Sequence, residues 1–226
     1  CGKGNDLAIK VFKNYLNFKI HKFESGKSLN GWQIPHAWSL KKGIIYNSKN
    51  EIIFDAKNKK FGVPILSKSF KGKISTKKLK KKIFYSKYKN YTPFNWTNLY
   101  RKNFLDWGFC MNKKEFDKLN DKEYFIDIIT KTRKSKMKVL EYTLKGKNKE
   151  TIIFNAHNCH PFQANDDISG CAVGIQLFRN LQKIKNRKFT YKLIIAPEIL
   201  GPLFWLKKIG NEKKHLKYCV LLKSVG

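Results

Sequence analysis

The sequence is poor in arginine, in acidic residues and in long apolar runs. Its 226 residues carry 48 basic side chains against 16 acidic ones, and only four of the basic ones are arginine. Proteins that read phosphates or base edges favour arginine, because its planar guanidinium donates paired hydrogen bonds. No run of 18 apolar residues occurs, so we expect no transmembrane helix. We therefore expect neither a specific nucleic-acid partner nor a membrane partner.

Paired cysteine motifs are also missing. The five cysteines are odd in number and include no CxxC pair, which argues against a disulfide framework. This usage fits a reducing compartment, and we expect a cytoplasmic protein. The chain opens with Cys1-Gly2-Lys3-Gly4, which is neither a methionine start nor an apolar signal peptide. We therefore expect that an N-terminal part is missing.

What is abundant is lysine, together with Ile, Asn, Phe and Tyr, and the formal net charge is +32. An AT-rich genome favours these amino acids, so we interpret the charge as mainly compositional. The alternative is a polyanion-binding surface, which predicts strongly salt-dependent binding without a metal. With 42% hydrophobic residues, the chain has enough apolar material for a core.

The first two thirds of the chain predict a mixture of short elements. Apolar spacing predicts a helix over 5–18, with Asn5 or Asp6 as its N-cap, and short helices over 77–84 and 114–120. Runs at 43–46 and 51–54 predict a β-hairpin, and 124–130 with 138–144 predict paired strands around 131–135. The tryptophans here form either a ligand platform or, as we prefer, the core of a small domain: Trp32, Trp38, Trp96 and Trp107.

After about residue 148 the pattern becomes regular. Apolar runs at 151–157, 190–196 and 218–222 predict buried strands, and 167–181 and 203–209 predict helices between them. This alternation of strands and helices indicates an α/β sheet. Open α/β sheets place their sites beyond the carboxyl ends of the strands.

Polar side chains gather at two of these strand ends. His157 and His160 follow the first strand, Asp166 and Asp167 begin the next helix, and Glu198 follows the second strand. Each has an ordinary structural explanation, such as a packed histidine, a helix cap or a salt bridge. Together, imidazole and carboxylate groups at one sheet edge are the ligand set of catalytic zinc.

The segment from His157 to Gly170 resembles the metal-binding stretch of co-catalytic zinc aminopeptidases. Those enzymes have a ligand histidine after a strand, then an Asn/Asp-Asp-Asn-x-Ser-Gly turn whose central Asp bridges two zinc ions. More closely, the chain is similar to a bacterial aminopeptidase-like family with His-x-Cys-His-Pro, Ala-Asn-Asp-Asn-x-Ser-Gly and Ala-Pro-Glu-Thr-Ile-Gly motifs. Here the last motif reads Ala196-Pro197-Glu198-Ile199-Leu200-Gly201.

The resemblance implies a fold and a division into domains. It implies an α/β fold with a mixed or parallel sheet and flanking helices, interrupted by a small β-rich inserted domain. The segments Trp32-x-Ile34-Pro35-x-x-Trp38 and Trp107-Gly108-Phe109-Cys110 resemble markers of that insert. We expect an N-terminal part at 1–30, the insert at 31–145 and the first part of the catalytic domain at 146–226.

The resemblance also implies roles for the site residues. His157 would ligate one zinc, and Asp166 would bridge two. Glu198 stands where the aminopeptidases have two glutamates, one a general base and one a ligand, so either role is open. His160 would replace a ligand, orient His157 or touch substrate, and Cys159 would ligate zinc or merely pack.

Two further positions are expected to lie near substrate or behind the ligands, namely Asn165 and Asp167, the latter replacing the family's usual Asn. The chain ends at Lys223-Ser224-Val225-Gly226, where the family tends to place an Asp. The aminopeptidases need two ligands from this point onward, so we expect a fragment that is inactive alone and a full-length protein with two zinc ions.

The function that the resemblance implies is hydrolysis of an N-terminal peptide bond or a related amide bond, on a peptide or a small amide. The first alternative is a catalytically degenerate relative that binds a protein or a glycan. The second is the polyanion-binding protein suggested by the charge. Substrate identity and oligomeric state are not predicted.

Overall fold

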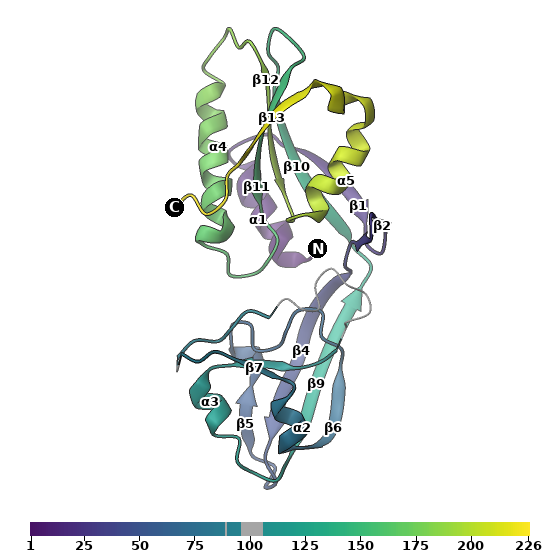
Figure 1. The fold of residues 1–226 in the computed structure, drawn as a ribbon, viewed down its shortest axis with the longest axis vertical. Coiled ribbons are helices and arrows are strands. Elements are labelled where there is room, and N and C mark those ends of the chain that lie inside the picture. The colour runs from purple at the N-terminus through teal and green to yellow at the C-terminus, as the bar shows by residue number, and fades with distance from the viewer. Residues whose placement is uncertain (89, 96–105) are drawn as a thin grey trace. The chain divides into compact units, whose positions relative to one another are not determined.

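The computed structural model describes residues 1–88, 90–95 and 106–226, and these form two compact units. Unit 1 comprises Cys1–His36 with Lys134–Gly226, and unit 2 is Ala37–Arg133. The insert that we expected at 31–145 is thus longer at both ends than unit 2. Figure 1 shows the elements of each unit.

Unit 1 is built on a mixed five-stranded sheet in the order β1-β10-β12-β11-β13 (Figure 1). β11 is parallel to both of its neighbours, β12 and β13, whereas β10 is antiparallel to both β12 and β1. The expected α/β fold with a mixed sheet is confirmed. The strands are β1 (Lys19–Glu24), β10 (Lys136–Leu144), β11 (Thr151–His157), β12 (Thr190–Ala196) and β13 (Leu216–Leu221).

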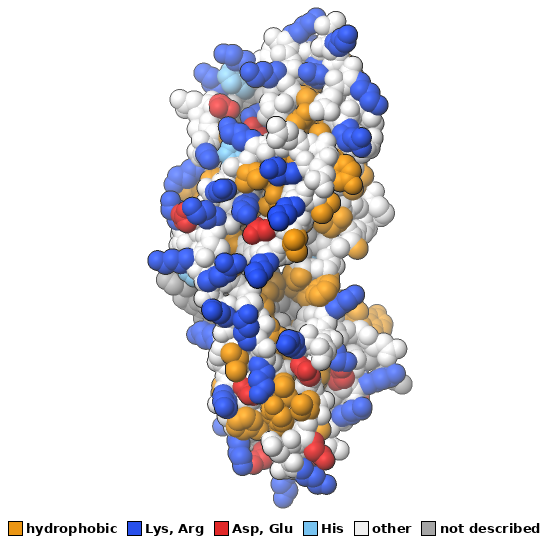
Figure 2. Space-filling view, turned by 180° about the vertical axis from the view of Figure 1, so that it is seen from behind, with side chains coloured by type: hydrophobic (Ala, Val, Ile, Leu, Met, Phe, Trp, Pro, Cys, Tyr) orange, Lys and Arg blue, Asp and Glu red, His pale blue; other side chains and the backbone are white. Residues whose placement is uncertain are grey.

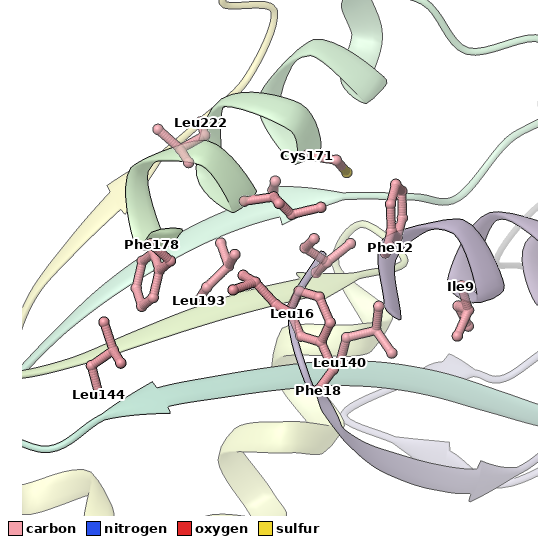
Figure 3. Close-up of a cluster of buried hydrophobic side chains, with 13 residues drawn as sticks. Ile9, Phe12, Leu16, Phe18, Leu140, Leu144, Cys171, Phe178, Leu193 and Leu222 are labelled. Carbon is pink, nitrogen blue, oxygen red and sulfur yellow. The ribbon is translucent and has the colours of Figure 1, made fainter. Parts of the chain in front are cut away.

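One face of this sheet is covered by α1 (Lys3–Lys13) and α4 (Gly170–Leu181), which share a single apolar core. Figure 3 shows Phe12 from α1 and Phe178 from α4 among the leucines of the sheet. Phe178 is fully buried and meets Phe154 and Tyr142 edge to face. This packing fixes α4, and with it the turn that precedes α4, against the end of β11.

The other face is covered by α5 (Leu200–Ile209), which follows β12 after a short turn. Its Trp205 is buried and donates from Nε1 to Glu141 Oε2 of β10 at 2.8 Å. Glu141 also accepts from Lys192 Nζ at 2.7 Å and lies 2.8 Å from His21 Nε2. Thr143 Oγ1 donates to Glu141 Oε1 at 3.0 Å, so four polar side chains surround this buried carboxylate and make its burial tolerable. The remaining elements of unit 1 are β2 (Ser28–Leu29), β3 (Trp32–Gln33) and a 3-10 helix at Gly210–His215.

Unit 2 contains a four-stranded antiparallel sheet in the order β5-β4-β9-β6 and a small parallel pair, β7-β8. The expected hairpin is present, because β4 pairs with β5. Trp38 and Trp107 pack against the core of this unit, Trp32 belongs to unit 1, and Trp96 lies outside the described residues. The elements are β4 (Ala37–Tyr46), β5 (Ile52–Asp55), a 3-10 helix (Ala56–Asn58), β6 (Phe70–Ser75), α2 (Thr76–Lys80), β7 (Ile83–Tyr85), β8 (Phe109–Met111), α3 (Lys113–Asp117) and β9 (Glu123–Arg133).

Three expected elements differ from the structure. The strands around 131–135 do not pair with each other, because β9 joins the sheet of unit 2 and β10 that of unit 1. The first helix begins at Lys3 with Gly2 as N-cap, so the predicted caps Asn5 and Asp6 are wrong, and it ends at Lys13. The segment 77–84 is divided between α2 and the start of β7.

Among the described residues, no helix combines the length and the apolar character needed to cross a membrane. All five cysteines are free thiols.

Candidate metal centre

The candidate site begins with His157, the last residue of β11, whose side chain is 8% exposed. Its Nδ1 lies 3.2 Å from Cys159 Sγ, and its Nε2 lies 2.9 Å from Asp166 Oδ1. The ring therefore has a thiol on one side and a carboxylate on the other. The backbone N–H of His157 donates to Asp167 Oδ2 at 2.9 Å, which fixes the strand end.

Asp166 and Asp167 stand in the turn Asn165–Ser169 that leads into α4, and the peptide bond between them is cis. Their roles separate clearly. Asp166 is exposed and faces the two histidines, whereas Asp167 is fully buried. Asp167 accepts the backbone N–H groups of His157 and Ser224, so it joins the end of β11 to the segment after β13.

His157 Nε2 provides a test of whether a metal fits. This atom is buried and makes no hydrogen bond, although Asp166 Oδ1 lies only 2.9 Å away. Buried polar atoms are normally satisfied, so a buried nitrogen that makes no hydrogen bond suits a further partner such as a metal ion. An imidazole nitrogen and a carboxylate oxygen that lie 2.9 Å apart are both groups that ligate zinc. The residues present fit a zinc ion at this position.

Glu198 follows β12 and completes a second group of ligand atoms. Among the described residues, His157, Cys159 and Glu198 each offer one ligand atom, and these atoms lie within 4.8 Å of one another. Burial raises the pKa of the Cys159 thiol to about 11, with the negative charges of Glu198 and Asp166 acting in the same direction. Without a cation beside it, this sulfur stays protonated at neutral pH.

The backbone directly after Glu198 is unusual. Ile199 has φ of 61° and ψ of −63°, and Leu200 N donates to Glu198 O at 2.6 Å. This is the rare positive-φ γ-turn, which is strained for a β-branched residue. It turns the chain sharply from β12 into α5, so that Glu198 stands at the end of the strand. Gly201 is needed immediately afterwards, because a Cβ there would lie 2.4 Å from Ala196 Cβ.

His160 and Asn165 have more peripheral positions. His160 Nε2 lies 3.8 Å from Asp166 Oδ2, beyond hydrogen-bond distance, and its Nδ1 lies 3.1 Å from Pro161 O. Asn165 Oδ1 accepts from Gly226 N at 2.9 Å and Ser169 Oγ at 3.0 Å, so it stabilises the turn.

The sequence analysis did not predict the roles of two residues with several polar contacts, Lys223 and Glu141. Lys223 donates from Nζ to Glu198 Oε1 at 2.8 Å, and this hydrogen bond raises its pKa, as do the charges of Asp166 and Asp167. Glu141 is the buried carboxylate of β10 that accepts a hydrogen bond from Trp205 of α5. In the sequence, Glu141 is a single acidic residue within the apolar run of β10. The alternation of side chains in that run does not decide on which face of the sheet Glu141 lies.

Comparison with known proteins places the chain among aminopeptidase-like folds. The model of the family described as "Domain of unknown function (DUF4910)" matches residues 1–226. A Clostridium acetobutylicum protein named "Putative polysaccharide biosynthesis protein with aminopeptidase-like domain" is 27% identical over 226 residues, which are all of this chain and 51% of that protein. The chain thus spans about half the length of this curated relative.

Two solved structures show the same fold. A crystal structure of a "putative peptidase" from Clostridium acetobutylicum superposes with a TM-score of 0.84 at 26% identity, covering 100% of this chain and 52% of that one. A zinc aminopeptidase from Bacillus subtilis superposes with a TM-score of 0.63 at 14% identity, covering 99% of this chain and 63% of that one.

Proposed function

The chain belongs to the DUF4910 family, and we propose that it carries part of the active site of a zinc-dependent aminopeptidase-like hydrolase. The observation that carries this proposal is the buried His157 Nε2, which makes no hydrogen bond and lies 2.9 Å from Asp166 Oδ1. In this proposal His157 Nε2 and Asp166 hold zinc, and Glu198 lies close to His157. Cys159 lies on the opposite, Nδ1 side of the His157 ring. The likeness to zinc aminopeptidases supports the choice of metal.

When bound there, zinc supplies the Lewis acidity that activates water and polarises an amide carbonyl. Glu198 acts as general base: it accepts a proton from the attacking water on Oε2, since Oε1 is engaged by Lys223, and delivers it to the leaving amine. Asp167 holds His157 in place, because its side chain accepts the backbone N–H of His157 at the end of β11. In this proposal His160, with Nε2 at 3.8 Å from Asp166 Oδ2, orients the carboxylate or meets substrate.

The surroundings of the site suit an apolar peptide or amide substrate. Exposed apolar side chains occur within two residues of three site residues. These are Phe162 beside His160, Ile199 beside Glu198 and Val225 beside Lys223. Exposed apolar groups next to polar catalytic groups are typical of sites that bind a hydrophobic side chain. The free thiols fit the reducing, cytoplasmic location that we propose.

The second candidate is a catalytically degenerate relative that binds a glycan or a protein. It is favoured by the ion pair of Glu198 with Lys223, which engages the proposed base, and by the name of the Clostridium relative. A polyanion-binding role receives less support. Figure 2 shows lysine and arginine scattered over the visible face among apolar and uncharged groups, not gathered into one stripe.

Hydrolysis of a panel of aminoacyl amides by the zinc-loaded protein at its natural length tests the proposal. We expect turnover that a chelator abolishes and that Glu198→Gln reduces by about 10²–10⁴-fold in kcat, the usual contribution of a general base. The matched control is Glu212→Gln, an exposed glutamate away from the site, which should leave kcat unchanged. No turnover with any amide would favour the binding candidate, and turnover that does not depend on zinc would contradict the metal mechanism.

A further inference from the structure

A cavity of about 460 Å³ lies in unit 1, at the end of the sheet opposite the candidate metal centre. It is lined by the connection between β10 and β11, by the first residues of β11, β12 and β13, and by the end of α5 with the 3-10 helix after it. Figure 1 shows that connection and the turn before α4 at opposite ends of β11. Because His157 is the last of the seven residues of β11, the strand separates the cavity from His157 by roughly 20 Å.

Three lysines of the connection between β10 and β11 line this cavity. They are Lys145, Lys147 and Lys149, which alternate with Gly146 and Asn148. All three are exposed, and within the part of the chain that the structure describes their ammonium groups have no acidic partner. The cavity therefore carries three positive charges that the protein itself does not pair.

The carboxylates nearby do not balance these charges. Glu212 is the one acidic residue among the described residues that line the cavity, and it is 67% exposed and lies 3.6 Å from Lys192 Nζ. Lys192 in turn donates to the buried Glu141 at 2.7 Å. Glu150, next to the three lysines, pairs with Lys217 at 3.2 Å. An excess of positive charge thus remains at the cavity.

The connection that carries the lysines is anchored by hydrogen bonds to the start of β12 and the residues before it. Thr190 Oγ1 accepts from Gly146 N at 3.2 Å and donates to Asn148 O at 3.1 Å. Lys147 N donates to Arg187 O at 2.8 Å. The backbone of the lysines is therefore already in place, and a ligand would have to order only their side chains, which lowers the entropic cost of binding.

This arrangement suits an anion of small size. Lysine ammonium groups bind phosphate as point charges, and a concave surface lined by one sign of charge concentrates ligands of the opposite sign. The cavity volume falls within the range of roughly 300–1,000 Å³ that is typical of small-molecule sites. It therefore has room for an organic group beside the phosphate.

We propose that this cavity is a binding site for a small phosphorylated molecule, whose phosphate is bound by Lys145, Lys147 and Lys149. The inference does not rest on the zinc site, because the two sites lie at opposite ends of β11. It also differs from a general polyanion-binding role, since the charges involved are confined to one cavity and the ligand is small.

Calorimetric titration of the protein at its natural length with inorganic pyrophosphate tests this inference. The ionic strength should be about 0.15 M, where charges more than about 8 Å away are largely screened. We expect the triple variant Lys145→Gln/Lys147→Gln/Lys149→Gln to bind pyrophosphate at least about tenfold more weakly than the wild type, the usual effect of losing one hydrogen bond to a charged group. Glu212→Gln should bind it more tightly, because a negative charge leaves the cavity.

The matched control is Lys77→Gln/Lys78→Gln/Lys81→Gln, which removes the same total charge from exposed lysines of unit 2 and should bind pyrophosphate as the wild type does. His157→Ala should also bind it as the wild type does, which separates this cavity from the candidate metal centre. Equal weakening in the two triple variants would mean that net charge alone attracts the anion, and it would overturn the inference. Loss of binding in His157→Ala, or no binding by the wild type, would overturn it as well.

Discussion

Individual residues at the site divide into those that face outward and those that hold the outward ones in place. His157 Nε2 and the Asp166 carboxylate lie against each other, whereas Asp167 and Asn165 accept hydrogen bonds from backbone N–H groups. Sequence patterns identify all four residue types, but they do not separate these two roles. The separation depends on which carboxylate the turn buries, and that is decided by packing against the segment after β13.

Ile199 is the residue at which backbone strain is concentrated. Its positive φ costs about 1–3 kcal/mol for a branched residue, and its side chain is 43% exposed, so little burial offsets the strain. We expect Ile199→Gly to raise the free energy of unfolding by about 1 kcal/mol, as measured by urea denaturation. Glycine adopts this conformation freely.

A matched control is Ile52→Gly, at an exposed isoleucine in the edge strand β5 that lacks a positive φ. That change should lower the free energy of unfolding by roughly 1 kcal/mol, because glycine loses more chain entropy in a strand. Equal destabilisation in both variants would mean that the turn after Glu198 stores no strain.

At the scale of elements, the sequence predicted the last third of the chain better than the rest. The strands β11, β12 and β13 and the helices between them have long apolar runs that local periodicity identifies directly. β9 and β10 are also found as strands, but their partners are wrong. Two strands separated by two residues look like a hairpin in sequence, and only the tertiary structure shows that they enter different sheets.

Contacts between segments that are distant in the chain were not predicted from the sequence either. The docking of residues 222–226 on the Asn165–Ser169 turn joins positions more than 50 residues apart. No periodicity records such a contact, which explains why the ion pair of Lys223 with Glu198 was not predicted. The strand-end rule for α/β sheets, in contrast, correctly brought His157, Asp166 and Glu198 to one edge.

At the scale of the whole molecule, the buried Glu141 makes stability depend on pH. Burial alone would raise the pKa of Glu141, but hydrogen bonds from Lys192 and Trp205 outweigh it and lower the pKa from 4.5 to about 2. A carboxyl with a depressed pKa stabilises the fold above its unfolded value and loses this contribution as the pH falls. The contribution is about 3 kcal/mol, lost between roughly pH 4.5 and 2.

Burial also lowers the pKa of His21 below 6.5, despite its contact with Glu141. Protonation of His21 at acidic pH therefore lowers the free energy of unfolding as well. We expect Glu141→Gln to lower the free energy of unfolding by about 3 kcal/mol at pH 7 and by much less near pH 3. Urea denaturation over this pH range measures the difference. Glu150→Gln, at an exposed ion pair, should follow the wild type at every pH.

The most direct measurement is the zinc content and zinc affinity of the protein at its natural length, compared between wild type, His157→Ala and His215→Ala. His215 lies in the 3-10 helix Gly210–His215, away from the candidate site. We expect wild type and His215→Ala to bind zinc alike, and His157→Ala to bind at least about 100-fold more weakly, because it loses a direct ligand. Equal zinc binding in all three proteins, or none in the wild type, would contradict a metal centre at His157.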